Sequence, residues 1–396
     1  MLKIGIVGTG FAARFHLEAW RRVHGVKVII AGATARSADR RKAFAEAHGI
    51  RAFDSYEELL KEVDVVDIVT PGNTHEAFAV SALNAGKHVV LEKPFTGFYG
   101  PGEAGPEFSG LTFDREAALA EVLASCRRIR EAALAAGRFI CYAENWIYAP
   151  AVQKEREILE KSGGQILRMT GEESHSGSHA SSYGWWSQCG GGALASKGCH
   201  PLSAAVYFKF VEGRARDGRP IFPVSVSANI HRITQLPGYR NEGYLRTEYH
   251  DTEDYGQMHV VFEDGTVADI LASDLVLGGV ANWIEVFAGN HRTRCNLNPV
   301  DALETFSPGV EALKDVYIAE KLHPKQGWMK PAPDEDWMHG YPQEIQAFAE
   351  AIESGRAPES SGMLGEVVTA VLYAAYLSAS RRGQSVEVPL STPAVY

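Results

Sequence analysis

A short apolar segment at the start of the chain runs directly into a glycine-rich turn, which constrains the fold more than any other feature. Residues 3–7 read Lys-Ile-Gly-Ile-Val, and a G-x-G-x-x-A motif follows before a predicted helix over 12–23. The glycines allow a tight turn and close approach to a pyrophosphate, and the helix amino terminus faces the phosphates. This pattern predicts a dinucleotide site that includes Gly8, Gly10, Phe11 and Ala12, with Ala13 as the small third residue.

The hydrophobic pattern divides the chain into two domains. Up to residue 143, predicted strands (26–33, 63–70, 88–95, 139–143) alternate with predicted helices (56–62, 76–85, 113–136). This alternation predicts a doubly wound parallel sheet, a Rossmann domain over 1–143. From 144 to 396, consecutive strands at 166–173, 224–231, 257–262, 266–273, 283–288 and 293–297 predict an open, largely antiparallel sheet. Helices are expected at 151–161, 200–208, 343–354 and 364–381, which gives an α+β domain that is expected to bind the substrate.

The end of the second strand bears on which nucleotide is bound. NAD sites usually carry a carboxylate here that holds the adenosine 2′-hydroxyl, but this chain has Arg36 and Ser37, with Arg40 and Arg41 a turn later. A guanidinium and a hydroxyl suit a 2′-phosphate, so the sequence favours NADP within an NAD(P) site. The alternative is that these arginines are solvated and that NAD binds without the carboxylate.

Two later strands end in polar residues that belong at the same edge of the sheet. The first is followed by a loop with Thr70, Asn73 and His75, and the second ends in Glu92-Lys93-Pro94. Pro94 biases Lys93 towards an extended backbone, and doubly wound sheets bind ligands at the carboxyl ends of their strands. We therefore predict that Thr70, Asn73, His75, Glu92 and Lys93 contact the cofactor. The alternative for Lys93 is a surface lysine that closes a strand.

Residues 96–112 differ in composition from the chain on either side. Glycine and proline recur there among three aromatic residues, which predicts a loop inserted directly after Lys93. Long loops in compact domains often serve as lids or binding loops. A flexible surface insertion is the alternative.

The second half contains two segments with functional side chains. The first supplies Asn145 and Tyr148 at the end of the strand that leaves the first domain. The second contains a triple glycine before a helix, which permits close approach of the backbone to a ligand. Its predicted substrate-binding residues are His175, His179, Trp185, Trp186, Ser196, Lys197 and His200. The tryptophans can instead belong to the core, and the histidines with Cys189 can form a metal set, but without a carboxylate partner we predict no metal.

Lys93 and His200 are the predicted catalytic residues. An acid–base group needs a pKa near the working pH, where histidine begins, and burial beside a cationic nicotinamide is expected to lower the pKa of Lys93 towards that range. Lys197 is a third cation that either binds an anionic substituent of the substrate or is merely solvated.

Composition narrows the partners. The chain has 396 residues and a net charge of −10, without a lysine/arginine block, so nucleic acid and anionic membrane surfaces are not expected partners. The amino terminus does not read as a signal peptide, and no apolar run approaches the roughly 20 residues that cross a bilayer. Five widely spaced cysteines without a C-x-x-C pair indicate a reducing cytoplasm. The composition as a whole makes a small molecule the expected substrate.

Taken in order, these motifs resemble the Gfo/Idh/MocA family, which includes glucose–fructose oxidoreductase and inositol dehydrogenase. The resemblance spans nearly the whole chain. It rests on the glycine turn, the 70–75 loop, Glu92-Lys93-Pro94 and the 190–200 segment that ends at His200. It implies NAD(P)-dependent hydride transfer at a secondary hydroxyl of a sugar or cyclitol, with the lysine on the reacting hydroxyl. It also implies a homodimer or homotetramer.

One departure from the family pattern concerns the catalytic pair. Inositol-dehydrogenase-like members have an aspartate where this chain has Ser196, so we expect His200 to lack a carboxylate partner and Lys93 to be the main base. The family also contains NAD-dependent glycosidases, which oxidise a sugar carbon, eliminate the aglycone, add water and return the hydride. That activity is the alternative function, possible also on an anionic glycoside.

Overall fold

The first sheet of the computed structural model is parallel and five-stranded, in the order β2-β1-β3-β4-β5. The structure describes residues 1–101, 108–178, 180–297, 303–322 and 325–390. The strands are β1 (Leu2–Val7), β2 (Val28–Thr34), β3 (Val65–Ile68), β4 (His88–Glu92) and β5 (Ile140–Ala143). The helices are α1 (Phe11–Arg22), α2 (Ala38–His48), α3 (Tyr56–Glu62), α4 (His75–Asn84) and α5 (Arg115–Ala136). Every residue of β3 and β5 is buried, as expected for strands covered by helices on both faces.

The second sheet has the strand order β11-β10-β6-β9-β8-β7-β14. All its pairs are antiparallel except β6 with β9. Its strands are β6 (Ile166–Ser174), β7 (Pro223–His231), β8 (Tyr255–Phe262), β9 (Val267–Ser273), β10 (Ala281–Ala288), β11 (Arg292–Asn296) and β14 (Val386–Glu387). Buried and less buried residues alternate along β8 and β9, so one face of this sheet meets the core. The predicted fold class, a Rossmann sheet followed by a largely antiparallel α+β sheet, is confirmed.

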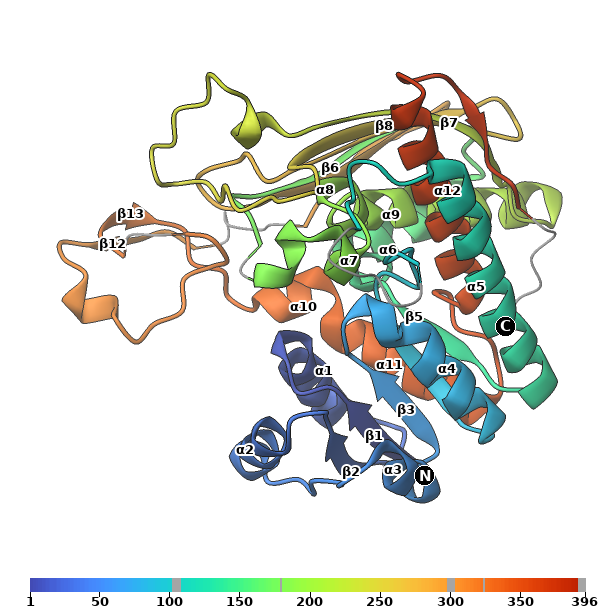
Figure 1. Cartoon of the computed structure of the whole chain (residues 1–396), viewed down its shortest axis with the longest axis vertical. Helices are drawn as coiled ribbons and strands as arrows, with labels where there is room; N and C mark the ends of the chain where they lie inside the picture. Colours follow the sequence, from blue (N-terminus) through green and yellow to red (C-terminus); the bar gives the residue numbers. More distant parts are fainter. Residues whose placement is uncertain (102–107, 179, 298–302, 323–324, 391–396) are drawn as a thin grey trace.

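Helices from the second half cover the buried face of this sheet and also reach the first sheet. They are α6 (Pro150–Ser162), α9 (Cys199–Asp217), α10 (Glu335–His339), α11 (Tyr341–Ser354) and α12 (Gly362–Ser380). α12 packs on β7 and on α5, and α11 packs on α1 (Figure 1). Buried apolar side chains form one cluster that runs from β1 to α12 and the second sheet. A domain boundary at residue 143 stays a prediction, because the carboxyl-terminal helices return to the first domain.

Short elements near the junction of the two sheets position the chemistry described below. They are η1 (Gly72–Thr74), η2 (Asn145–Tyr148), η3 (Ser181–Gly184), α7 (Trp186–Cys189) and α8 (Ala193–Ser196). The sequence pattern did not predict α10 or the hairpin of β12 (Thr305–Ser307) and β13 (Gly327–Met329), which projects from the body in Figure 1. The remaining turns are η4 (Ile233–Gln235) and η5 (Glu311–Leu313).

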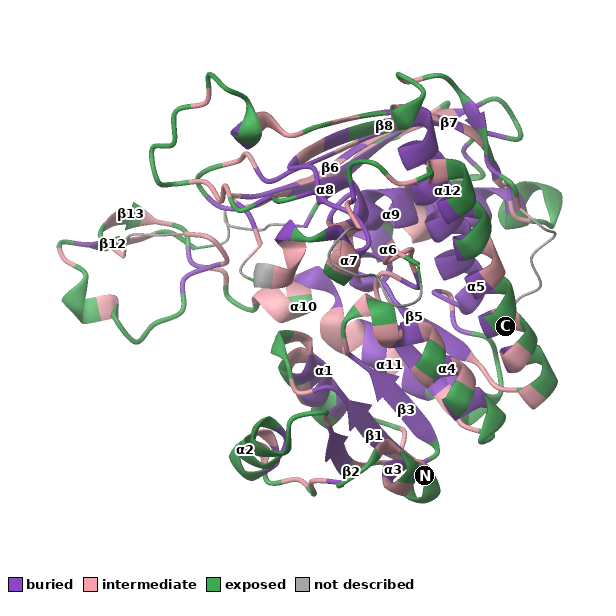
Figure 2. Cartoon of the chain, in the orientation of Figure 1, coloured by how far each residue is buried: buried purple, intermediate pink, exposed green. Residues whose placement is uncertain are grey.

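Two helices differ from their predicted limits for identifiable reasons. α5 begins at Arg115 rather than at 113, because the Asp114 side chain accepts hydrogen bonds from the backbone N–H groups of Glu116 and Ala117. α9 is much longer than predicted, since all of its first fifteen residues are buried and no polar face marks its course (Figure 2).

α12 is long and apolar enough, by length and composition, to cross a membrane, which corrects the expectation that no such run exists. However, 94% of its apolar window is buried inside the protein. This burial is the behaviour of a core helix in a globular fold.

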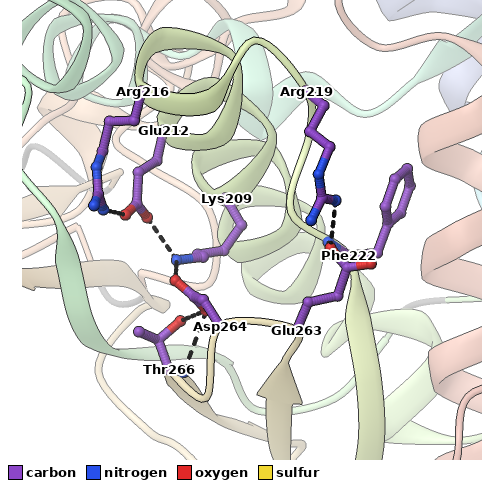
Figure 3. A network of polar contacts seen from close by, with 8 residues as sticks. All are labelled: Lys209, Glu212, Arg216, Arg219, Phe222, Glu263, Asp264 and Thr266. Atoms are coloured by element: carbon purple, nitrogen blue, oxygen red, sulfur yellow. Dashed lines mark hydrogen bonds and ion pairs between the residues drawn. The ribbon is translucent and has the colours of Figure 1, made fainter.

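A buried ionic network ties α9 to the turn between β8 and β9 (Figure 3). The Lys209 ammonium lies 2.5 Å from a carboxylate oxygen of Glu212 and 2.8 Å from one of Asp264. Arg216 pairs with the other oxygen of Glu212 at 2.6 Å. Because Lys209 and Glu212 are fully buried, each needs its partners to offset the cost of leaving water.

Candidate active site

The glycine turn after β1 has the geometry of a nucleotide-binding turn. Gly8 has φ +114°, and a Cβ there would lie 2.8 Å from the carbonyl oxygen of Val69, so only glycine fits. A Cβ on Gly10 would meet nothing within 4 Å, so the space in front of α1 is open. No side chain caps this end of α1 and its first turn has no acidic residue, which suits a pyrophosphate. Phe11 is exposed at the same position.

Four polar residues follow β2. Ser37 and Arg41 make hydrogen bonds within the protein, and Arg36 and Arg40 are available to a ligand. Arg36 and Arg40 are exposed. Ser37 caps α2, since its hydroxyl accepts a hydrogen bond from the N–H of Arg40. Arg41 is buried and engaged, because it donates to the carbonyl of Ala35 at 3.1 Å and to Asp54 at 2.8 Å. Arg36 and Arg40 are thus the two guanidinium groups that can turn towards a ligand.

His75 is a brace between the two strand-end loops. Its ring is fully buried, with Nδ1 2.8 Å from the carbonyl oxygen of Pro94 and Nε2 2.9 Å from that of Thr70. Burial lowers the pKa of His75, and the two carbonyls oppose that shift. The Thr70 hydroxyl accepts a hydrogen bond from Thr74, and Asn73 is exposed. Both ring nitrogens of His75 are therefore engaged within the protein, and its cofactor contact stays a prediction.

Glu92 is held by a buried network that sequence reasoning missed. His16 lies between Asp67 (Nδ1 to Oδ1, 2.9 Å) and Glu92 (Nε2 to Oε1, 3.2 Å). The pKa of His16 is raised because these carboxylates outweigh the effect of burial, and His16 in turn helps to lower the pKa of Glu92. The other Glu92 oxygen accepts a hydrogen bond from the backbone N–H of Lys93. An aspartate inside the apolar strand β3 was the available signal.

The Lys93 side chain reaches into the second domain. Its ammonium donates a hydrogen bond to the carbonyl oxygen of Ser196 at 3.0 Å. Burial alone would lower the pKa of Lys93, but the nearby Tyr183, Cys199, Glu173 and Glu92 outweigh it and the pKa is raised. The expectation of a lowered pKa is therefore wrong for the protein on its own.

His200 has a carboxylate partner after all, which corrects the expectation drawn from Ser196. Nδ1 of His200 lies 2.6 Å from Oε1 of Glu144, a residue at the end of β5 and next to the predicted Asn145. On the other side of the ring, Nε2 lies 3.9 Å from Oε2 of Glu173. Burial tends to lower the pKa of His200, but the two carboxylates prevail and raise it. Trp146 stacks on the imidazole, with the ring centroids 5.9 Å apart.

Lys197 is neutralised within the protein. Its ammonium forms an ion pair with Asp274 at 2.6 Å, and both side chains are buried. Nδ1 of His175 accepts a hydrogen bond from the N–H of Gly177 at 2.9 Å and lies 3.7 Å from the same Asp274 carboxylate. Neither of the two roles predicted for Lys197, an anion anchor or a solvated cation, agrees with this pair.

The other predicted substrate residues separate into buried and exposed groups. Asn145 donates a hydrogen bond to the carbonyl of His339, and the Tyr148 hydroxyl accepts one from the N–H of Ser360. Trp186 is buried, so these three side chains support the fold rather than face a ligand. Trp185 is 43% exposed and stacks on His250 at 3.9 Å. His179 lies outside the described residues.

The insertion is attached firmly where the structure describes it, at 96–101 and 108–112. The Tyr373 hydroxyl accepts a hydrogen bond from the N–H of Phe98 and donates one to the carbonyl of Gly190. Trp186 donates to the carbonyl of Phe98, and Asp251 accepts from the N–H groups of Gly110 and Trp186. Both ends of the insertion thus pack on the triple-glycine segment.

One cluster near His200 has the composition of a metal site. Ligand atoms of Glu144, Cys199 and His200 lie within 4.8 Å of one another, and all three residues are buried. Burial raises the pKa of the Cys199 thiol, and the Glu144 carboxylate is already bonded to His200. The donor set therefore fits an oriented histidine better than a cation.

Comparisons with known proteins identify relatives of the amino-terminal part of the chain. Residues 2–103 match the family model GFO_IDH_MocA, described as an oxidoreductase family with an NAD-binding Rossmann fold. UDP-N-acetylglucosamine 3-dehydrogenase of Acidithiobacillus ferrooxidans is 40% identical over 95 residues, which are 24% of this chain and 29% of that protein. Inositol 2-dehydrogenase of Leifsonia xyli is 38% identical over 102 residues, 24% of this chain and 28% of that protein. These alignments span less than a third of either relative.

Solved structures resemble nearly the whole chain, and one of them contains a bound nucleotide. GenD2 from gentamicin A biosynthesis, in complex with NAD, is similar with a TM-score of 0.76 and 23% identity, over 98% of this chain and 97% of that one. At this identity the likeness establishes the shared two-sheet fold.

Proposed function

We propose that this chain, whose residues 2–103 belong to the Gfo/Idh/MocA oxidoreductases, transfers hydride between NAD(P) and a secondary hydroxyl or ketone of a sugar, sugar derivative or cyclitol. The observation that carries the proposal is a contact between the two halves of the chain. Lys93 follows β4 in the sheet that carries the nucleotide turn, and its ammonium donates a hydrogen bond to the backbone carbonyl of Ser196, in the segment that leads to His200. The dehydrogenase names of the relatives support the same reaction class.

The residues fit the cofactor at each of its parts. Gly8, Gly10 and the open end of α1 would hold the pyrophosphate, and Arg36 would face a 2′-phosphate, so we propose a preference for NADP. When bound, the nicotinamide supplies the hydride acceptor or donor. The Glu92 network fixes the backbone of Lys93 at the edge of the sheet where that ring belongs.

In this proposal Lys93 and His200 divide the work on the reacting oxygen. The Lys93 ammonium binds the oxygen and stabilises negative charge on it. His200 moves the proton through Nε2, because Nδ1 is committed to Glu144. The pKa values of both groups are raised, and lysine starts from the higher ordinary value, so Lys93 stays an ammonium and His200 carries most of the acid–base chemistry.

The proposal is tested with a panel of sugars and cyclitols, by the absorbance change of the nicotinamide. The wild-type protein should turn over at least one polyol, and Lys93→Ala should lower the rate by about 10²-fold or more. The proposal fails if a protein with bound cofactor gives no absorbance change with any member of the panel.

Two of the features that favour the NAD-dependent glycosidase alternative, a free Lys197 and a His200 without a carboxylate, do not match the structure, and the inserted loop after Lys93 is the third. Lys197 is paired with Asp274, and Glu144 supplies the carboxylate that Ser196 does not. The two reactions differ in one observable, since a glycosidase of this kind would cleave aryl glycosides and exchange the C–H next to the anomeric carbon with solvent deuterium. We expect neither.

We also propose that the protein works in the cytoplasm as a homodimer or homotetramer. The described residues include five free cysteines, which suits a reducing compartment. The second sheet has a face away from its helices along which partly buried side chains alternate, and such a face suits self-association. Light scattering after size-exclusion chromatography would measure the assembly.

A further inference from the structure

We infer that Glu173 binds a second hydroxyl of the substrate, on the carbon next to the reacting one, and so restricts the enzyme to rings with a free vicinal diol. This inference rests on the proposed function and adds a specificity-determining residue to it.

The Glu173 carboxylate lies opposite the imidazole of His200. Glu173 lies on β6 and faces His200 of α9, with Oε2 3.9 Å from Nε2 of the imidazole. This distance is too long for a direct hydrogen bond, which needs about 2.7–3.2 Å. The two atoms are nevertheless close enough to hold neighbouring hydroxyl groups, because adjacent ring oxygens are separated by roughly one hydrogen-bond length. His200 would hold the reacting oxygen and Glu173 the next one.

Glu173 has no evident structural role among the residues that the structure describes. Oε2 is buried, yet it has no hydrogen-bond partner among the residues that the structure describes. Glu253, another buried carboxylate, shows the contrast, because it accepts hydrogen bonds from two backbone N–H groups and from the Tyr376 hydroxyl. A buried acceptor left without a donor is costly, so a donor from a ligand is the natural complement.

Charged groups surround the Glu173 carboxyl group. Burial raises the pKa of Glu173, while His200, Lys93 and Lys197 oppose that shift. The unpaired oxygen is an acceptor for a hydroxyl, and the three nearby cations favour the ionised form, in which that bond is charge-assisted. The contact moves no proton and needs no further reactant. A hydroxyl that is removed or methylated cannot donate this bond, so such an analogue would leave the carboxylate unpaired.

The experiment compares the wild type, Glu173→Gln and Glu160→Gln, where Glu160 is exposed on α6 and serves as the control. Each protein is assayed with the best substrate among glucose, its methyl glycosides and myo-inositol, and with the analogue that is deoxy next to the oxidised carbon. The same ligands are titrated calorimetrically into the protein–cofactor complex, so that binding is read independently of turnover.

We expect Glu173→Gln to lower kcat/KM for the diol by about 10- to 100-fold, chiefly through KM, with a matching loss of affinity. For the deoxy analogue the same variant should change both values less than about threefold, and Glu160→Gln should change neither. Equal losses on diol and analogue would overturn the inference, because Glu173 would then act on the reacting oxygen or on the fold. An unchanged Glu173→Gln would overturn it as well.

The proposed function can fail separately. Diol-selective loss of binding without turnover in any protein would reject the hydride transfer and keep the role of Glu173. Turnover that requires Lys93 but not Glu173 would do the reverse, and the absence of both binding and turnover would reject both.

Discussion

Oε1 of Glu144 lies 2.6 Å from Nδ1 of His200, although the two residues are 56 positions apart. Glu144 follows β5 of the first sheet, and His200 lies in α9, which packs on the second sheet. The carboxylate fixes the ring orientation and engages Nδ1. In the proposed function this leaves Nε2 for the substrate, and Glu144 takes the role that the family resemblance assigns to an aspartate at the position of Ser196.

The first prediction concerns this pair. Glu144→Gln removes the charge that raises the pKa of His200, so that pKa should fall. We expect the rate to drop about tenfold or more and the acidic limb of the oxidation profile to move to lower pH. Steady-state rates across pH would measure both. A lower rate with an unmoved limb would show that Glu144 affects only the fold, and Glu160→Gln is again the control.

A second prediction concerns the direction of the reaction. Oxidation needs His200 in its neutral form and reduction needs the imidazolium. Because the pKa of His200 is raised above its ordinary value, the neutral form appears only as pH rises beyond that value. Alcohol oxidation should therefore increase with pH, with its midpoint above the ordinary histidine value, and ketone reduction should decline over the same range. Initial rates in both directions across pH would contradict this if oxidation peaked below neutrality.

The third prediction concerns nucleotide choice. Arg36→Ala should raise KM for NADP about tenfold and leave KM for NAD nearly unchanged, because only NADP carries the 2′-phosphate. Arg127→Ala, an exposed arginine on α5, is the matched control. Equal effects on the two nucleotides would argue that Arg36 is solvated, as the alternative reading of the sequence holds.

The fourth prediction concerns the buried network of Figure 3. Lys209→Met leaves the carboxylates of Glu212 and Asp264 without their shared cation, so it should lower the free energy of unfolding by about 3 kcal/mol. Arg219→Met removes an exposed pair with Glu263 and should leave the free energy of unfolding nearly unchanged. Chemical denaturation of both variants would measure the difference, and similar losses would contradict the assigned burial effect.

The sequence predicted the fold well because its signals are local. Strand and helix periods and glycine turns each lie within a few residues, and the structure places them close to the expected positions. The strand predicted over 88–95 is shorter, since β4 ends at Glu92. The full length of α9 was not predicted, because burial on all sides removes the hydrophobic period that would mark the helix. The hairpin β12–β13 has strands of three residues each, too short to show alternation.

The site was predicted less completely because its decisive contacts join residues that are far apart in the chain. The Glu144–His200 pair and the His16 bridge between Asp67 and Glu92 cannot be found from spacing. Lys197 was misjudged for the same reason, since its partner Asp274 follows β9, far along the chain. The sequence shows that Lys197 lies next to a motif, but it does not show that a distant carboxylate, Asp274, pairs with it.

The last prediction concerns Glu344 on α11, a buried carboxyl group. Neither of its oxygens has a hydrogen-bond partner among the described residues, and burial raises its pKa well above the ordinary value. A group whose pKa is higher in the folded state favours folding fully only below its unfolded pKa, and that contribution is lost as pH rises towards the folded pKa. Glu344 therefore destabilises the protein progressively above about pH 4.5.

Glu344→Gln removes this titration and keeps the shape of the side chain. We expect little change in unfolding free energy near pH 4.5 and a relative gain that grows by about 1.4 kcal/mol per pH unit until the folded pKa is reached. Urea denaturation at several pH values would measure the slope. Glu350→Gln, exposed on the same helix, should show no such slope. A gain that did not depend on pH would indicate that the effect is one of packing, and a loss at neutral pH would show that the Glu344 carboxylate has a partner that stabilises its charge.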